Sequence, residues 1–412
     1  MSYETSTAAP VASDGIPAHV PPDRVLRGAM PGMDPATCPY EQHAALHDGP
    51  RALYMPANFM MPTGAWIISR VEDIREVFQS PEVFSSDGIA GFSRLVGEAW
   101  PLIPLELDPP DHGKYRTLLN GIFSPAKMKA LEDGVRARAV SLIEAVKDKG
   151  ECEFNAAFGR PFPVLIFMQI MGLPEEDFEM LIGWEHDLLH AGFDMEQRVR
   201  GAQGFLGYLR ELIAKRRAAP KDDLATFVVQ AEVDGRPMTD DEVLGIYYLL
   251  VVAGLDTVAA SLGLHFRHLA QHPEDQARLR ADPSLIPGAV EEFLRRYGIV
   301  MTSRYVTRDA DMADVQVKAG ERVMISTMAG SLDPTEFENP LQVDIDRPAN
   351  RHVSFAYGPH RCLGSHLARR ELIIAIEEWL KRVPAFSIKD GQDVPVKSGG
   401  LLCVETLPLV WG

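Results

Sequence analysis

The chain has 412 residues, 46% of them hydrophobic and 24% charged, and carries a formal net charge of −17 at pH 7. This length allows one large domain or two to three average ones, and the hydrophobic fraction is ample for a buried core. The negative charge argues against nucleic acid or an anionic membrane surface as a general partner. The four cysteines are scattered without a C-x-x-C pair. They indicate neither a disulfide framework nor a zinc site, and are typical of a reducing cytoplasm.

The N-terminal stretch is rich in Ala, Pro, Ser and Thr, with neither a basic start nor an apolar core, so it does not resemble a signal peptide. No run of about 18 apolar residues occurs elsewhere. We therefore predict a flexible arm over residues 1–33 and one large domain over residues 34–412. The protein is expected to be cytoplasmic, monomeric and without a membrane anchor.

Hydrophobic periodicity predicts a mainly α fold with small β-sheets. Two short strands around a turn come first, then a helix, then an irregular loop over residues 88–104. Helices dominate up to residue 297, β-like alternation covers residues 304–326, residues 331–351 are irregular, and a β pair closes the chain. The helices expected besides the longest one are 71–79, 111–123, 125–148, 163–171, 175–189, 195–218, 224–231, 274–281, 287–297 and 363–381.

The longest predicted helix begins at the capping box Thr239-Asp-Asp-Glu242 and runs to about Ala270. Its middle is apolar on every side, which is typical of a helix at the centre of a large core. Asp256 and Thr257 interrupt this apolar stretch. A buried carboxylate without a partner is strongly penalised, so the pair indicates a function, although a solvent-reaching Asp and a locally bonded Thr explain it equally well. A Thr hydroxyl bonded to the carbonyl one turn back would open the helix there.

A loop of the form Phe355-x-x-Gly358-x-His360-x-Cys362-x-Gly364 precedes the last predicted helix. At a helix start, the Cys362 thiol would face unpaired N–H groups and the positive end of the helix dipole, which lowers a thiol pKa and favours the metal-binding thiolate. The two glycines would let the backbone turn or approach a flat group, and the Phe355 ring would shield the sulfur. A lone cysteine is more often a small buried hydrophobe, but these neighbours argue against that interpretation.

This loop resembles the haem-binding loop of the cytochromes P-450. From about Asp34 to its end, the chain is similar to bacterial class I members of that family, the camphor hydroxylase and its terpenoid-oxidising relatives. The segments that carry the similarity beyond the loop are Val251–Val258, His366–Glu371, Lys397–Gly399 and Leu407–Trp411. The resemblance implies a triangular-prism fold with a single haem domain, one haem b, and Cys362 as the axial thiolate ligand of the iron.

The resemblance assigns roles to further residues. Asp256 and Thr257 look like the acid–alcohol pair that supplies protons during oxygen activation. Glu292, Arg295 and Arg347 look like the structural triad that clamps the irregular stretch behind the haem. Basic side chains would make charge-assisted bonds to the two haem propionates. The haem contacts implied are His112, Arg116, Gly254, Arg304, Phe355, Gly358, His360 and Gly364.

Departures from the camphor hydroxylase argue against camphor itself as the substrate. Trp100 stands where that enzyme uses a tyrosine to bond the substrate ketone, and its indole N–H could donate instead. Thr302 replaces an aspartate that bonds a propionate, and Gly400 replaces an isoleucine that touches substrate. We expect a small apolar terpenoid or norisoprenoid ketone of ionone-like or camphor-like size. The residues expected to line its pocket are Trp100, Leu102, Leu249, Val252, Ala253, Val300, Thr302 and Leu401. Ordinary core packing explains each of them equally well.

Between Arg160 and Arg198 the sequence has no Lys or Arg, whereas the camphor hydroxylase pairs its distal aspartate with such side chains. We predict that His186, His190 or water contacts Asp256 instead. A titrating histidine at this position would make turnover sensitive to pH near neutrality.

The resemblance also implies O2 as co-substrate and electrons from NADH through a flavoprotein reductase and a [2Fe–2S] ferredoxin. The residues expected to receive the acidic ferredoxin are Arg75, Lys114, Arg116 and Arg361. The predicted reaction is hydroxylation of an unactivated C–H bond. Two alternatives stay open, a peroxide-driven peroxygenase and a non-catalytic haem- or ligand-binding sensor.

Overall fold

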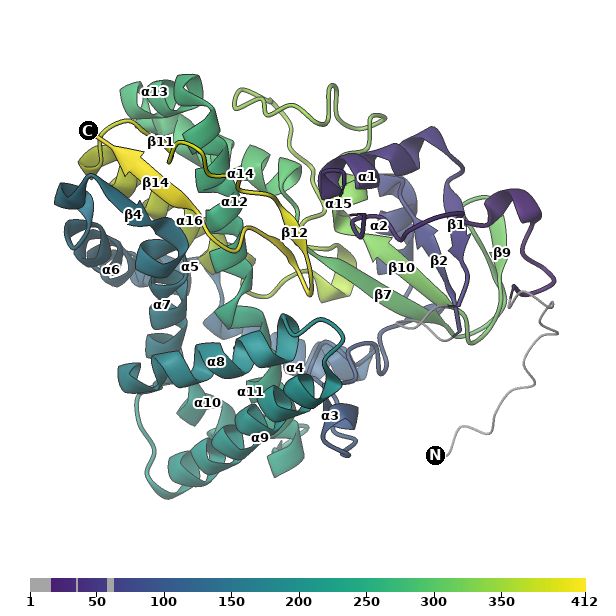
Figure 1. Cartoon of the computed structure of the whole chain (residues 1–412). Helices are drawn as coiled ribbons and strands as arrows, with labels where there is room; N and C mark the ends of the chain where they lie inside the picture. Colours follow the sequence, from purple (N-terminus) through teal and green to yellow (C-terminus); the bar gives the residue numbers. More distant parts are fainter. Residues whose placement is uncertain (1–15, 35, 58–62) are drawn as a thin grey trace.

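The computed structural model describes residues 16–412 except residue 35 and residues 58–62. Helices make up one part of the molecule, and a sheet flanked by short helices makes up the other (Figure 1). The helices are α1 (Pro39–Ala45), α2 (Val71–Gln79), α3 (Phe92–Leu95), α4 (Asp111–Ile122), α5 (Pro125–Ala130), α6 (Glu132–Glu144), α7 (Pro161–Met171), α8 (Phe178–Leu189), α9 (Met195–Ala218), α10 (Leu224–Gln230), α11 (Asp240–Leu255), α12 (Thr257–Gln271), α13 (Pro273–Ala281), α14 (Ile286–Arg296), α15 (Thr327–Ser331) and α16 (Ser365–Arg382). The mainly α fold with small sheets is confirmed.

The larger sheet has the strand order β1-β2-β10-β7-β3. β2 and β10 run parallel, and the other neighbours are antiparallel. The smaller sheet has the order β11-β14-β4, and three two-stranded pairs complete the β-structure of the described residues. The strands are β1 (Ala52–Met55), β2 (Ala65–Ile68), β3 (Phe84–Ser85), β4 (Glu151–Glu153), β5 (Glu232–Val233), β6 (Arg236–Pro237), β7 (Met301–Val306), β8 (Ala310–Met312), β9 (Val315–Val317), β10 (Arg322–Ser326), β11 (Phe386–Ile388), β12 (Lys397–Ser398), β13 (Leu402–Cys403) and β14 (Pro408–Trp411).

The long central helix is two helices. α11 begins at the predicted capping box, in which Thr239 and Glu242 bond each other's backbone N–H, and ends at Leu255; α12 begins at Thr257. The predicted continuous helix is therefore wrong at Asp256, whose backbone (φ −111°) leaves the regular helix. Among the described residues, only the segment Asp240–Gln271 is long and apolar enough to span a membrane. However, 67% of its most apolar part is buried within the fold. This burial is what a core helix requires.

The N-terminal residues 16–33 differ from the predicted flexible arm. His19 lies 3.0 Å from Glu321, the Leu26 N–H donates to the Tyr54 carbonyl, and Val20 is buried against the sheet. Residues 1–15 of the predicted arm lie outside the described residues. The described part of the arm is thus held by backbone bonding and apolar burial, with His19 in contact with Glu321.

Three other local predictions differ from the structure. The expected helix 125–148 is divided into α5 and α6, and the expected loop 88–104 contains the short helix α3. The closing β pair is a three-stranded sheet, in which β14 lies between β11 and β4. β4 is remote in sequence from β14, and local periodicity carries no information about which distant strands pair.

Glu292 on α14 is a buried acceptor for several donors. It takes two hydrogen bonds from Arg295, at 2.7 and 2.6 Å, and one from Arg347 at 3.0 Å. The Asn350 amide and the Asp344 N–H add two more. Burial acts to raise the pKa of Glu292, but these donors and the charge of Arg295 outweigh it and hold that pKa below its usual range. The three predicted members of the triad thus meet and tie the irregular stretch around residues 338–350 to α14.

We expect Arg295→Ala to lower the free energy of unfolding of the haem-loaded protein by about 3–5 kcal/mol. Removing one partner leaves the Glu292 carboxylate buried and under-compensated, and Arg295 is itself fully buried. Chemical denaturation measures the change. The matched control is Arg278→Ala, which breaks an exposed pair with Asp346 (2.8 Å) and should cost less than about 1 kcal/mol. Equal losses in the two variants would contradict the clamping role.

Candidate active site

The cysteine loop is tightly folded just before α16. The Cys362 N–H donates to the Phe355 carbonyl at 2.8 Å. Gly358 has φ +66°, and a Cβ there would lie 2.7 Å from the Phe78 carbonyl oxygen, so this turn requires glycine. At Gly364 no heavy atom lies within 4 Å of a Cβ position, which leaves room for a flat group. The guanidinium of Arg369 lies over the Phe355 ring, 4.5 Å from the centroid of the ring.

The Cys362 side chain is exposed, yet the protein atoms that surround its sulfur keep most water away from it. This desolvation raises the pKa of its thiol, while the Gly364 N–H and the charges of Arg116, Arg369 and Arg361 act in the opposite direction. The predicted lowering of the thiol pKa is therefore wrong for the protein without a bound metal. The donors expected at the helix start are present, but desolvation outweighs them.

Four basic side chains gather close to this loop, from α4, β7 and the loop itself. The rings of His112 and His360 lie 4.2 Å apart. Arg304 is buried, and its guanidinium lies over the Phe78 ring and donates to the Ser303 carbonyl. Arg116 donates to Asn120. Among the described residues, none of the four basic groups makes an ion pair with a carboxylate, and the buried His112 Nε2 has no hydrogen-bond partner.

The electrostatics of this basic cluster favour an anionic ligand. Burial, followed by repulsion from Arg304, His112 and Arg116, lowers the pKa of His360 to about 3. Burial likewise lowers the pKa of Arg304 to about 10 and the pKa values of His112 and Arg116. A buried arginine that lacks a carboxylate partner is costly, so an anion bound among these groups would stabilise all of them.

The break between α11 and α12 contains the predicted acid and hydroxyl. The Thr257 hydroxyl donates to the Ala253 carbonyl at 3.0 Å, which confirms the expected bond to the preceding turn. Asp256 is 6% exposed, whereas Ala253 is exposed although it lies in a core helix. A helix that opens at one turn and presents a small side chain there can admit small molecules.

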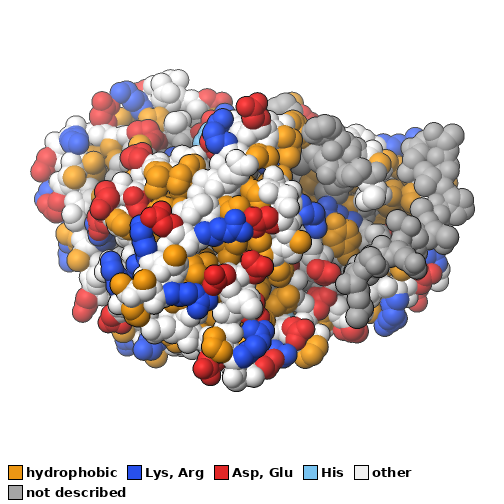
Figure 2. Space-filling view, turned by 90° about the horizontal axis from the view of Figure 1, so that it is seen from below, with side chains coloured by type: hydrophobic (Ala, Val, Ile, Leu, Met, Phe, Trp, Pro, Cys, Tyr) orange, Lys and Arg blue, Asp and Glu red, His pale blue; other side chains and the backbone are white. Residues whose placement is uncertain are grey.

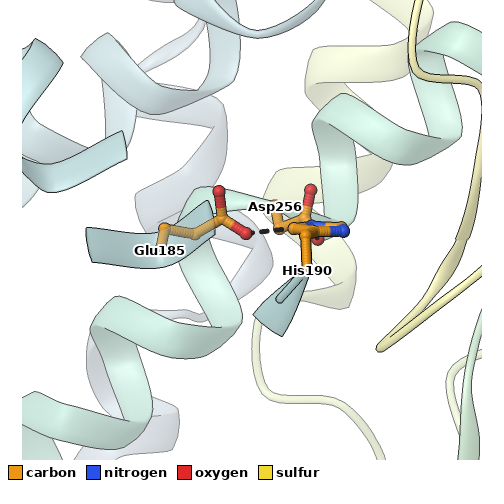
Figure 3. Close-up of side chains that lie close together, drawn as sticks. All are labelled: Glu185, His190 and Asp256. Carbon is orange, nitrogen blue, oxygen red and sulfur yellow. Dashed lines mark hydrogen bonds and ion pairs between the residues drawn. The ribbon is translucent and has the colours of Figure 1, made fainter. Parts of the chain in front are cut away.

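His190 contacts Asp256, as one branch of the prediction required. His190 lies directly after α8, and its Nε2 is 2.9 Å from Asp256 Oδ2 and 3.1 Å from Glu185 Oε1 (Figure 3). His186 does not contact Asp256; its ring lies 5.8 Å from that of His190. The hydrogen bond to Asp256 and the contact with the Glu185 carboxylate raise the pKa of His190 to about 10. This imidazole stays charged at pH 7, so titration of His190 does not supply the pH sensitivity near neutrality that was expected of turnover.

The raised pKa predicts a pH-dependent contribution of His190 to stability. A pKa of about 10 in the folded protein against about 6.5 in the unfolded chain gives a stabilisation that is complete below the lower value and lost as the pH rises through the higher one. We expect His190→Gln to cost more free energy of unfolding at pH 7 than at pH 10. Denaturation of the haem-loaded protein at several pH values measures this difference. A cost that does not change with pH would contradict the prediction.

The predicted pocket residues fall into two groups. Trp100 and Leu102 are buried. The others are at least partly accessible to solvent, and most of them pack against the buried core. They are Leu249, Val252, Ala253, Val300, Thr302 and Leu401. Partial exposure of apolar side chains inside the fold is compatible with a ligand pocket, and their role as a substrate site stays a prediction.

Contacts at Trp100 and Gly254 add to what the sequence suggested. The Trp100 indole N–H donates to Glu98 at 2.5 Å, and Glu98 also binds Arg210, so this N–H is not available to a substrate ketone. A Cβ on Gly254 would lie 2.5 Å from the Phe167 ring. Phe167 is thus a neighbour that requires glycine at this position of α11, and the haem contact of Gly254 stays a prediction.

The candidate docking residues differ in how strongly they are engaged. Arg75 binds Glu336 at 3.1 Å, and Lys114 binds both Asp111 and Asp234. Arg361 is exposed, and in the described part of the chain neither it nor Arg116 makes an ion pair. In the face shown in Figure 2, acidic and basic side chains are interspersed. Arg116 and Arg361 therefore offer more charge to a partner than Arg75 and Lys114.

Glu185 is the residue of this region that sequence reasoning missed. It lies on the same face of α8 as the buried Leu181, Ile182 and Leu188. A carboxylate on a buried apolar stripe is costly unless it has a partner. That pattern could have indicated a contact between Glu185 and one of the nearby histidines.

Comparison with known protein families matches residues 186–409 to the cytochrome P450 family, and the chain belongs to that family. It is a P450 monooxygenase, which uses haem b with thiolate-coordinated iron, O2 and a redox partner.

The chain is 42% identical to the probable cytochrome P450 127A1 of Sinorhizobium fredii over 409 residues, which cover 97% of this chain and 98% of that relative. It is 36% identical to the cyclomarin C epoxidase CymV of Salinispora arenicola, covering 83% and 88%. The crystal structure of cytochrome P450 CYP101C1 superimposes with a TM-score of 0.86 at 35% identity, covering 96% of this chain and 100% of the other. CYP101J2 gives a TM-score of 0.83, also at 35% identity, covering 96% and 99%.

The residues present fit a haem. Cys362 supplies the thiolate donor, and Gly364 leaves space beside the loop. Arg304 and His112 are buried polar groups without an anionic partner among the described residues. Two propionates would provide the missing carboxylates.

Proposed function

We propose that residues 34–412 form one haem domain that hydroxylates an unactivated C–H bond of a small apolar terpenoid or norisoprenoid ketone. The electrons come from a [2Fe–2S] ferredoxin and its NADH-dependent reductase, and the setting is the cytoplasm. The observation that carries the oxygen-activating part is the buried Asp256 at an opened helix turn, bonded to His190 and next to the Thr257 hydroxyl. A peroxide-driven enzyme does not require such a proton-supplying pair.

The apolar side chains that are partly accessible within the core support a hydrocarbon-like substrate. Because the Trp100 N–H is engaged by Glu98, Thr302 is the polar side chain left among the candidates to meet a ketone. Thr302 lies on β7 and is partly accessible. One hydroxyl among apolar contacts would orient a ketone weakly, which suits a small substrate held mainly by shape.

The chain's own residues divide the task between binding and proton supply. Cys362 holds the iron, and His112, Arg116, Arg304 and His360 hold the propionates. The haem, when bound, supplies the oxidising chemistry. Thr257 accepts and donates hydrogen bonds at the opened turn, and Asp256 passes protons to it from the solvent side, where His190 is partly accessible.

Titration of ionones and camphor into the haem-loaded protein tests the substrate class. A Cβ on Gly400 would lie 2.9 Å from the Leu189 carbonyl oxygen, so the room expected at this glycine is already filled. We still expect an ionone to shift the haem from low to high spin at lower concentration than camphor, because its longer hydrocarbon frame would contact more of the partly accessible apolar side chains. A larger response to camphor than to every ionone would contradict the assignment.

Product formation tests the electron source. Ferredoxin, reductase and NADH together should yield hydroxylated ketone, and omission of the ferredoxin should abolish it. Peroxide alone should give less product than the ferredoxin system. Faster product formation with peroxide would indicate a peroxygenase, and a spin shift without product under any condition would indicate a ligand sensor.

A further inference from the structure

Two buried carboxylates converge on a single imidazole nitrogen where the end of α8 meets the break between α11 and α12 (Figure 3). His190 Nε2 lies 2.9 Å from Asp256 Oδ2 and 3.1 Å from Glu185 Oε1. The three atoms all lie within 4.8 Å of one another. These side chains come from two segments far apart in the sequence, so the fold, not local chain geometry, brings them together.

The hydrogen-bond capacity of this cluster does not match its charge. One Nε2–H serves one acceptor well, and the bond goes to Asp256. Glu185 is 3% exposed, and its Oε1 points at the same nitrogen, yet this atom has no hydrogen-bond partner in the described part of the chain. Even with His190 positively charged, two carboxylates face one cation. Arg160 acts on Glu185 only at longer range.

The surrounding groups do not remove this imbalance. Burial raises the pKa of Glu185, and the charge of Asp256 raises it further. Burial and the same two carboxylates raise the pKa of the neighbouring Cys403 thiol, which keeps that thiol neutral. The His186 ring lies 5.8 Å from that of His190. Two carboxylates beside one charged imidazole leave an excess negative charge, and a buried excess charge is strongly unfavourable. The cluster would therefore gain from a second positive charge, whether a proton or a metal ion.

We infer that Glu185, His190 and Asp256 form a binding site for one divalent transition-metal ion of the zinc type. A neutral imidazole nitrogen and two carboxylate oxygens are donors that such ions accept, with a solvent molecule as a fourth. Ligand atoms about 2.0–2.2 Å from a tetrahedral ion lie roughly 3.3 Å apart. The two distances from His190 Nε2 are close to that separation. The ion would have to displace the proton on Nε2. Its two positive charges would then balance the two negative charges of the carboxylates.

The ion has a route to the site and a consequence once bound. The His190 side chain is 19% exposed, so the site is open to solvent on one side. A bound ion would engage Asp256 and keep it from supplying protons to Thr257. This inhibitory consequence rests on the proposed function, whereas the binding itself does not.

Equilibrium dialysis of the haem-loaded protein against micromolar Zn²⁺, followed by metal analysis, tests the site. We expect the wild type to hold one equivalent of Zn²⁺ more than His190→Ala, and Glu185→Gln to bind that equivalent at least tenfold more weakly. His272→Ala is the matched control, because His272 pairs at the surface with a single carboxylate, Glu274, at 3.1 Å; it should bind as the wild type does. Circular dichroism and the haem spectrum report whether each variant is folded.

Equal Zn²⁺ binding by the wild type, His190→Ala and Glu185→Gln would overturn the site, since the ion would then be held elsewhere. Turnover separates the site from its consequence. Zn²⁺ should lower the yield of product per NADH in the wild type without changing the spin shift caused by substrate. Binding of the extra equivalent with no effect on yield would leave the site standing and would contradict the role proposed for Asp256.

Discussion

Replacing Cys362 by serine is expected to remove the red-shifted band of the reduced carbonyl complex and to lower ferredoxin-driven turnover roughly a thousandfold or more, which corresponds to about 4 kcal/mol in the barrier. The physical reason is the loss of a soft thiolate donor that pushes electron density toward the iron. A serine hydroxyl keeps the size of the side chain, and the N–H bond to the Phe355 carbonyl is a backbone bond. The loop should therefore stay folded while the iron loses its thiolate.

The carbonyl difference spectrum is the measurement, and Cys152→Ser is the matched control. Cys152 is a half-buried cysteine of β4 whose pKa burial raises to about 12, so it cannot serve as a thiolate near neutral pH. That variant should keep both the band and turnover. A Cys362→Ser protein with an unchanged red-shifted band would refute the assignment of the axial ligand.

We expect Asp256→Asn to lower the rate of product formation by about 10²–10³-fold, because an amide keeps the size of the carboxylate but neither releases nor takes up a proton near neutral pH. The concentration of substrate that gives half of the spin shift should stay within about threefold of the wild-type value, since Asp256 bonds His190 and not the substrate. Steady-state kinetics and spin-shift titrations separate the two quantities. Equal losses in rate and in substrate affinity would indicate that the variant distorts the pocket instead.

Hydroxyl variants of α12 distinguish proton supply from simple helix packing. Thr257→Ala should divert a larger share of the electrons into peroxide, while Thr257→Ser should resemble the wild type. Ser261→Ala is the matched control, because the Ser261 hydroxyl donates to the Thr257 carbonyl at 2.9 Å, one turn further along the same helix. Peroxide assays per NADH consumed provide the comparison. An equal rise in peroxide in Thr257→Ala and Ser261→Ala would contradict a special role for Thr257.

Features that depend on neighbouring residues could be predicted well. The capping box at Thr239 and the Thr257 bond to Ala253 involve residues three or four positions apart, so helix geometry alone brings them together. The loop before α16 is also local, and its glycine requirement at Gly358 follows from a positive φ. The lack of Lys and Arg between Arg160 and Arg198 limited the predicted partner of Asp256 to His186, His190 or water, and the structure selects His190.

The failures concern contacts between remote segments. The Trp100 N–H was expected to donate to a substrate ketone, but Glu98, which also binds Arg210 of α9, accepts it. The glycine at position 254 is required by Phe167 of α7, a neighbour that the sequence could not identify. Residues 16–33 look like a free arm by composition, yet they bond and pack against the sheet. Composition and periodicity describe one segment at a time and do not contain these pairings.

The amino-acid sequence by itself determined the helical fold class, the thiolate loop and the acid–hydroxyl pair, because each depends on residues that are close together in the sequence. Only the tertiary structure decided the charge state of the site. Depth in the fold raises the thiol pKa of Cys362, and Glu185 and Asp256 together keep His190 charged at neutral pH. Desolvation and Coulomb interactions depend on distances across the folded chain, and these distances exist only once α8, α11, α12 and the cysteine loop have packed together.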